Sequence, residues 1–163
     1  MAVQPPFKQI IIINQKNYDE SKKAEEVFTK KTPYITYIIM GICVLLYLLT
    51  SFIGGNILEQ NPNILYRFGA LVSANFIGSN YIELFRLVTS TFLHASLLHL
   101  ICNMYSLYVI GPQLESFFGK TKFIIIYIMS GIMGNLLSLL FLSGNVVSVG
   151  ASGALFGLLG ALL

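Results

Sequence analysis

Long apolar stretches alternate with polar segments along the chain. Uncharged, mainly apolar residues occupy 34–53, 92–111, 123–142 and 146–163. At about 1.5 Å per residue, roughly 20 helical residues cross the ~30 Å hydrocarbon core of a bilayer. The pattern therefore predicts an all-α, polytopic membrane helical bundle with three complete spans. The fourth stretch offers only about 14 helical residues, so we interpret the sequence as cut within its fourth transmembrane helix.

The segment between the first two spans, residues 54–91, is long for a connection. It contains the turn sequences Gly54-Gly55 and Asn61-Pro62-Asn63, separated by apolar pieces too short to cross a membrane. Because apolar loops of this length are unusual, we expect a structured insert that lies in the outer interface. Arg67 and Arg86 are expected to face lipid headgroups or to cap loops within it.

Residues 1–33 precede the first span as a polar arm. Within the arm, residues 7–13 could form a short strand or an interfacial patch, and 18–31 has a charged, helical pattern. Six of the chain's ten Lys and Arg residues lie here: Lys8, Lys16, Lys22, Lys23, Lys30 and Lys31. We interpret this charge as a solvated face and a topology signal, and a partner-binding arm is the alternative. Residues 34–163 are then the membrane domain.

Basic residues also set the expected orientation. Lys30 and Lys31 come directly before the first span, and Lys120 and Lys122 follow the second. Gly111-Pro112 is expected to end the second span and to begin a loop. By the positive-inside rule, the N-terminus and this loop are cytoplasmic, which makes the protein a multi-pass integral membrane protein. We place it in the plasma membrane of a bacterium.

Composition excludes several other classes of function. The chain is 55% hydrophobic and only 10% charged, whereas soluble domains carry about 25% charged residues. No basic tract suggests nucleic-acid binding. Cys43 and Cys102 both lie in apolar runs and are not expected to pair, and no Cys or His cluster indicates a metal. We therefore expect no metal and no organic cofactor.

Ser152 lies among small residues at the start of the fourth apolar stretch. Gly153 and Gly157 are four residues apart, so they share one helix face and would let a neighbouring helix approach closely. Alternatively, the small neighbours leave Ser152 Oγ and nearby backbone N–H groups accessible, as a nucleophile requires. On this stretch alone, helix packing is the favoured interpretation.

The second span carries His94, His99 and Asn103. His99 and Asn103 share one helix face, whereas His94 lies about 140° round the helix, which makes the two histidines a poor metal pair. Taken alone, His99 and Asn103 could simply form interhelical hydrogen bonds. However, polar groups within a span usually face a protein interior or a water-filled cavity. The second and fourth spans both enter from the outer side, so these side chains and Ser152 can lie at a similar depth in the membrane. Together they would supply the parts of an acyl-transfer site.

Residues 34–163 resemble the rhomboid intramembrane serine proteases. Four segments carry the resemblance, and their order and spacing make it specific. They are Phe85-Arg86, in place of the family's Trp-Arg pair; His94-x4-His99-x3-Asn103; Gly111-Pro112-x2-Glu115-x3-Gly119; and Gly150-Ala151-Ser152-Gly153-x3-Gly157.

The resemblance implies a Ser–His dyad with Ser152 as the nucleophile. The oxyanion hole would be formed by the backbone N–H of Ser152 with the side chains of His99 and Asn103. His94 would have a structural or water-retaining role. The remaining motif residues would support the structure: Arg86, Glu115, Gly119, Gly150, Gly153 and Gly157.

The family's general base is a histidine on the sixth core helix, in an Ala-His-x2-Gly context that residues 1–163 do not contain. We therefore expect four of six core helices here, and a fragment that is inactive alone. The implied activity is hydrolysis of a peptide bond in or near a substrate's transmembrane segment. The alternative is a non-catalytic rhomboid-like protein that binds membrane clients, against which the retention of Ser152, His99 and Asn103 argues. A transporter would need paired broken helices, which the pattern lacks.

Overall fold

The computed structural model describes residues 15–20, 22, 32–77, 83–141 and 146–161. These belong to two compact units, 1–32 and 33–163. In the first unit, residues 15–20 are helical. The strand or patch expected at 7–13 and most of the helix expected at 18–31 lie outside the described residues. All elements named below belong to the second unit.

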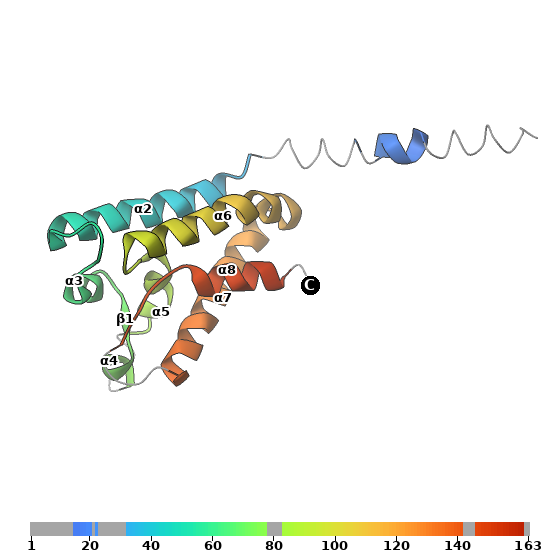
Figure 1. Cartoon of the computed structure of the whole chain (residues 1–163). Helices are drawn as coiled ribbons and strands as arrows, with labels where there is room; N and C mark the ends of the chain where they lie inside the picture. Colours follow the sequence, from blue (N-terminus) through green and yellow to red (C-terminus); the bar gives the residue numbers. More distant parts are fainter. Residues whose placement is uncertain (1–14, 21, 23–31, 78–82, 142–145, 162–163) are drawn as a thin grey trace, which may run out of the picture. The chain divides into compact units, whose positions relative to one another are not determined.

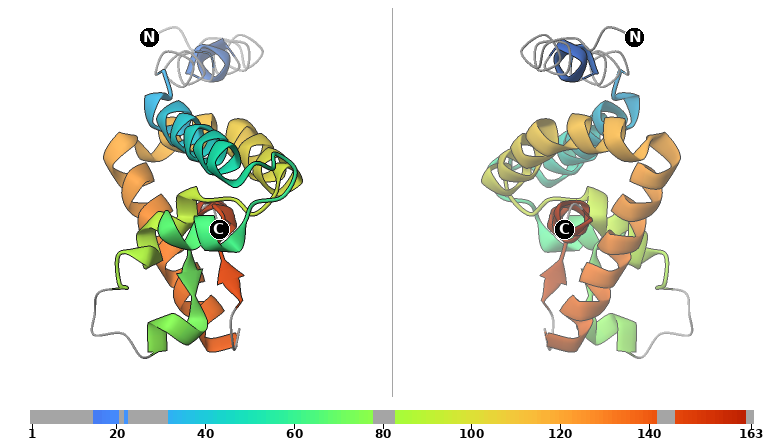
Figure 2. Two further views of the ribbon diagram at one scale, coloured as in Figure 1. Left: turned by 90° about the vertical axis from the view of Figure 1, so that its left-hand side faces the viewer. Right: turned by 90° about the vertical axis from the view of Figure 1, so that its right-hand side faces the viewer.

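Four helices form the bundle of the second unit: α2 (Tyr34–Gly54), α6 (Leu97–Phe118), α7 (Lys120–Phe141) and α8 (Ser152–Gly160). α2 and α6 run side by side, and α8 packs against both α6 and α7 (Figure 1). In Figure 2, α8 is seen end-on beneath the layer of α2 and α6. The predicted all-α fold is confirmed, and the first predicted span matches α2 closely.

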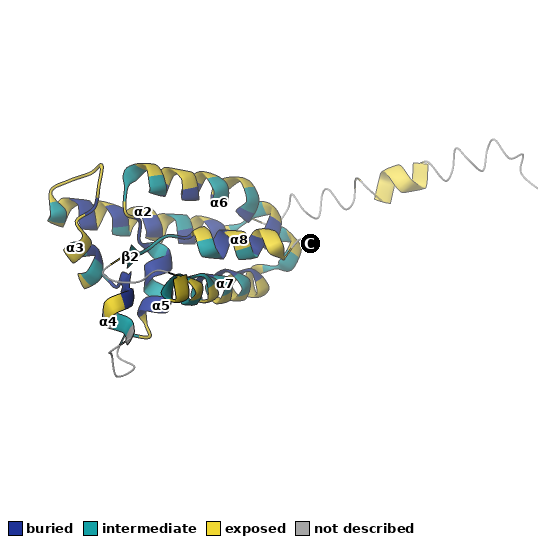
Figure 3. Cartoon of the chain, turned by 60° about the horizontal axis from the view of Figure 1, so that its bottom comes forward, coloured by how far each residue is buried: buried dark blue, intermediate teal, exposed yellow. Residues whose placement is uncertain are grey.

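The core of the bundle draws on all four helices, and one face of each contributes to it. Its most deeply buried side chains include Cys43, Tyr47, Leu107, Phe123, Tyr127 and Leu158. The outer faces of the same helices are exposed, as Figure 3 shows, although they carry large apolar side chains such as Phe52, Leu98 and Phe141. Among the described helices, α2 and α7 are long and apolar enough to cross a membrane. Apolar outer faces on helices of this length are suited to contact with lipid.

The second helix does not end at Gly111-Pro112, so that prediction was wrong. α6 starts at Leu97, continues through Pro112 to Phe118, and is followed by Gly119 alone before α7 begins. No loop separates these helices, and the expected loop residues belong to their ends. Gly119 adopts a positive φ of 77° and its N–H donates to Glu115 O at 2.9 Å, so the glycine that ends the helix comes eight positions later than expected.

The physical reason lies in the contact with α2. Glu115 is buried, and its carboxylate accepts hydrogen bonds from Ile35 N (3.1 Å), Thr36 N (2.8 Å) and Thr36 Oγ1 (2.8 Å). One turn earlier, a Cβ on Gly111 would lie 2.5 Å from Thr36 Cγ2, so only glycine fits there. These contacts cap the N-terminus of α2 and hold the turn beyond Pro112 in the helix. Membrane helices tolerate an internal proline when neighbours supply such contacts.

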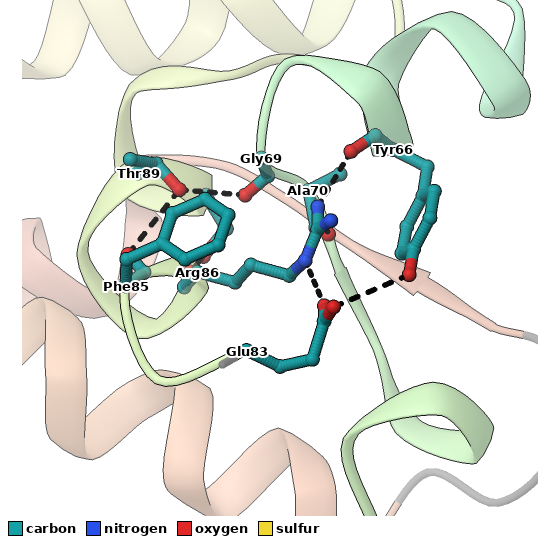
Figure 4. A network of polar contacts seen from close by, with 8 residues as sticks. Tyr66, Gly69, Ala70, Glu83, Phe85, Arg86 and Thr89 are labelled. Atoms are coloured by element: carbon teal, nitrogen blue, oxygen red, sulfur yellow. Dashed lines mark hydrogen bonds and ion pairs between the residues drawn. The ribbon is translucent and has the colours of Figure 1, made fainter. Parts of the chain in front are cut away.

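The insert between α2 and α6 is structured, as predicted. It contains α3 (Pro62–Arg67), β1 (Leu71–Val72), α4 (Ser73–Ile77), α5 (Arg86–Thr89) and the 3₁₀ turn η1 (Ser90–Phe92). Arg67 is exposed on α3, whereas Arg86 is buried and caps a loop. The Arg86 guanidinium donates to Tyr66 O (2.5 Å) and Ala70 O (3.1 Å), pairs with Glu83, and stacks on the Tyr66 ring at 3.9 Å (Figure 4).

The fourth helix begins at Ser152 and not at residue 146, which corrects the fourth predicted span. Before it, β2 (Val147–Ser148) pairs antiparallel with β1, with Leu71 opposite Ser148 and Val72 opposite Val147. Gly150 then has φ 126°, a conformation incompatible with a helix. The apolar pattern could not show this, because the strand forms only through pairing with the distant insert. The pairing leaves Ser152 as the first residue of α8.

Candidate active site

Ser152 occupies the N-terminus of α8. The residue before it, Ala151, is buried, and the first backbone hydrogen bond of the helix runs from Leu155 N to Ala151 O at 2.9 Å. The N–H of Ser152 therefore has no partner within the helix. The Ser152 side chain is exposed. A free N–H at the positive end of a helix, beside an accessible hydroxyl, can stabilise a developing negative charge.

His99 and Asn103 lie one turn apart in the first half of α6. Ser96 starts the helix, because its Oγ accepts from His99 N at 3.2 Å. Asn103 is buried, and its Nδ2 donates to His99 O at 2.8 Å. Since an amide nitrogen carries two hydrogens, the second remains available for another acceptor.

The structure brings Ser152, His99 and Asn103 together at one cavity of about 430 Å³ between α6 and α8. The remaining lining is mostly apolar: Cys102, Tyr105, Ser106, Val109, Ile110, Leu155, Phe156 and Leu159. A few convergent polar groups in an apolar pocket are typical of a binding site. The Ser152 hydroxyl and the hydrogen-bond donors beside it can carry out acyl transfer if a base is supplied.

His94 does not line this cavity, and it lies before the start of α6 at Leu97. The expectation that His94 shares a helix with His99 was therefore wrong, because the helix begins only at the Ser96 cap. It is 1% exposed, and its ring meets the His99 ring edge-on, with centroids 5.2 Å apart and an interplanar angle of 64°. Within the described residues neither His94 ring nitrogen has a hydrogen-bond partner. The geometry thus places His94 behind His99, where it can fix the orientation of that ring.

Gly150 closes the other side of His99. A Cβ at this position would lie 2.6 Å from His99 Cε1 and 2.7 Å from Nε2, so any side chain would displace the imidazole. The positive φ of Gly150 also disfavours every other residue. The loop before the serine is therefore fitted directly against a proposed oxyanion donor.

The two interpretations of the Ser152 motif are compatible, because its glycines face away from the cavity. A Cβ on Gly153 would lie 3.2 Å from Gly134 Cα, and one on Gly157 would overlap the Ser130 side chain. These glycines allow α8 to pack closely on α7, as the small-residue spacing predicts. Ser152 itself remains free to face the cavity.

Sequence reasoning did not single out Asn135, which is buried on α7. Its Nδ2 donates to Leu87 O and to Ser90 Oγ, both at 2.8 Å. An amide inside an otherwise apolar span is a signal that could have identified it. Its partners could not have been identified, since they lie in the insert. No group of three or more possible metal ligands occurs among the described residues.

The motifs also match known proteins. Residues 81–163, half of the chain, match the Rhomboid domain. The chain belongs to the rhomboid family. It is 35% identical over 146 residues to Rhomboid protease GluP of Bacillus subtilis (strain 168), an alignment that covers 89% of this chain and 27% of that protein. It is 42% identical over 112 residues to RHOMBOID-like protein 6, mitochondrial, of Arabidopsis thaliana, covering 65% of this chain and 36% of that relative.

A third relative carries a different description. Inactive RHOMBOID-like protein 8 of Arabidopsis thaliana is 43% identical over 81 residues, or 50% of this chain and 23% of its own length. The chain thus spans 23–36% of the length of these three relatives. Family membership and the apolar helices together make this rhomboid an integral membrane protein.

Proposed function

We propose that the full-length protein is an intramembrane serine endopeptidase that cleaves peptide bonds in or near the transmembrane segments of other membrane proteins. The observation that carries this proposal is the cavity shared by Ser152, His99 and Asn103. The name of the GluP relative, a rhomboid protease, supports the same activity. The bilayer and transmembrane protein substrates are the proposed partners.

In the proposed reaction, Ser152 Oγ attacks the scissile carbonyl carbon while its proton passes to a histidine base. The negative charge on the carbonyl oxygen would be stabilised by the N–H of Ser152 together with His99 and Asn103. The carbon–nitrogen bond then breaks, the base protonates the leaving amine, and water hydrolyses the acyl-enzyme. His94 and His99 are the only histidines in residues 1–163, and both are proposed to have other roles. The base is therefore proposed to lie outside these residues.

A non-catalytic, client-binding rhomboid is the second candidate, because one relative is described as inactive. This candidate does not require a nucleophile, an oxyanion donor and an amide to converge. The convergence of all three on one cavity favours the protease.

Covalent labelling tests the protease proposal directly. We expect a fluorophosphonate to react with the full-length protein in detergent, and peptide mapping by mass spectrometry to locate the adduct on Ser152. Ser106 provides the internal control, because it lines the same cavity but its hydroxyl donates to Cys102 O within α6 at 2.9 Å. An adduct on Ser106, or cleavage of a transmembrane substrate that persists with no adduct at all, would contradict the proposal.

Orientation is a separate prediction. The C-terminus of α6 and the start of α7 meet at Gly119, and Lys120 stacks over the Tyr34 ring at 4.6 Å, so this end of the unit is also where α2 begins. We propose that this end is cytoplasmic, in a bacterial plasma membrane, as the positive-inside rule implies. Reporter fusions at residues 20, 60, 118 and 145 should read in, out, in and out. An inward reading at residue 60 would refute this orientation.

A further inference from the structure

α7 contacts two different parts of the site with two adjacent faces. Ser130 and Gly134 lie against Gly157 and Gly153 of α8, as described above. One position further along, Gly131 and Asn135 lie against η1. A Cβ on Gly131 would be 2.6 Å from Thr91 Cγ2, so the turn sits directly on the helix surface.

Asn135 fixes this turn through its side-chain amide. It is 6% exposed, and its Nδ2 donates to Leu87 O and Ser90 Oγ. The Ser90 hydroxyl in turn donates to Arg86 O at 2.6 Å. Both hydrogens of the Asn135 amide therefore bond to the α5–η1 segment. The Ser90 hydroxyl accepts one of them and donates its own hydrogen to Arg86 O.

Ser90 also bonds to the loop that precedes Ser152. Its backbone carbonyl accepts from Gly150 N at 2.9 Å. A continuous path of contacts therefore runs from Asn135 through Ser90 to Gly150, which contacts His99 and precedes Ser152 by two residues.

We propose that Asn135 is a positioning residue, which sets the distance between the Gly150–Ser152 loop and His99 by anchoring Ser90. This inference rests on the proposed protease function. Asn135 does not line the cavity and touches none of the proposed reacting groups. Its effect should therefore appear as a loss of alignment in the transition state and not as a loss of substrate binding.

The test uses the full-length protein with Asn135→Leu, which keeps the side-chain size but removes both donors. Since a small misplacement of reacting groups lowers the rate without weakening binding, we expect kcat to fall about tenfold while KM changes less than about twofold. The rate of fluorophosphonate labelling of Ser152 should fall in parallel. Ser138→Ala is the matched control, because Ser138 is on the same helix and its hydroxyl donates within α7 to Gly134 O at 3.1 Å. It should leave kcat unchanged.

Ser90→Ala supplies a smaller change if Asn135→Leu fails to fold. It should lower kcat several-fold, and the double variant should be close to Asn135→Leu, because the bond between the two side chains is already lost in that single variant. An unchanged kcat per folded molecule in both single variants, with only a lower thermal midpoint, would overturn the positioning role while leaving the protease intact. A wild-type protein without Ser152-dependent cleavage would overturn both.

Discussion

Ser152→Ala in the full-length protein is expected to reduce cleavage of a transmembrane substrate to background. The change removes the atom that would form the acyl-enzyme. In serine proteases, loss of the nucleophile costs on the order of 10⁶ in kcat. Because Ser152 is exposed at the first turn of α8 and its side chain makes no hydrogen bond that supports the fold in the described structure, the thermal midpoint should remain near that of the wild type.

Ser106→Ala is the matched control for this experiment. Both serines line the same cavity, but the Ser106 hydroxyl is engaged with the carbonyl of Cys102 on its own helix. Cleavage should therefore be close to normal in Ser106→Ala, and product formation can be followed on a gel from purified enzyme in liposomes. Substantial turnover by Ser152→Ala, or an equal loss in both variants, would show that the serine has been assigned the wrong role.

The apolar pattern alone predicts the bundle well where no distant segment intervenes. The first span was expected at 34–53 and α2 is Tyr34–Gly54, while the third was expected at 123–142 and α7 is Lys120–Phe141. Both helices lie between polar ends, so local hydropathy determines their limits. The four-residue spacing of Gly153 and Gly157 likewise predicts their close packing against a neighbour, since this depends only on which face they share.

Three boundaries were wrong, since α6 also starts at Leu97 and not at residue 92. The other two arise where tertiary contacts override local propensity. Gly111-Pro112 would normally stop a helix, but Glu115 bonds to Thr36, 79 residues away, and keeps the last turns of α6 in place. Conversely, residues 146–151 have a helical apolar pattern, but Val147 and Ser148 pair with β1 as a strand. A pattern read along the chain contains no information on such distant partners.

The same reasoning separates the parts of the site that could be predicted from those that could not. His99, Asn103 and Ser152 carry recognisable spacing, and the order of the spans brings their helix ends to one side. Asn135 has no motif, and its bond to Ser90 joins residues 45 positions apart. Only the folded chain shows that α7 contacts, through Asn135 and Ser90, the loop that precedes Ser152.

Asn103→Ala in the full-length protein is expected to lower kcat by about 10²–10³, equivalent to roughly 3–4 kcal/mol, while KM rises far less. One hydrogen of its amide is already bonded to His99 O, so the proposed oxyanion bond would use the second. If Asn103 serves only as a structural contact within α6, its loss should instead lower the thermal midpoint. Activity per folded molecule would then be almost unchanged.

Gln113→Ala separates these outcomes, because Gln113 makes the same kind of contact further along α6. Its Nε2 donates to Val109 O, four residues back, at 3.3 Å, and its exposed side chain does not line the cavity. Both variants lose an amide bonded to its own helix, but only Asn103→Ala loses a donor at the reaction site. A drop in kcat confined to Asn103→Ala would therefore indicate transition-state stabilisation. Equal and small effects in both variants, with kcat measured alongside the thermal midpoint, would remove Asn103 from the proposed oxyanion hole.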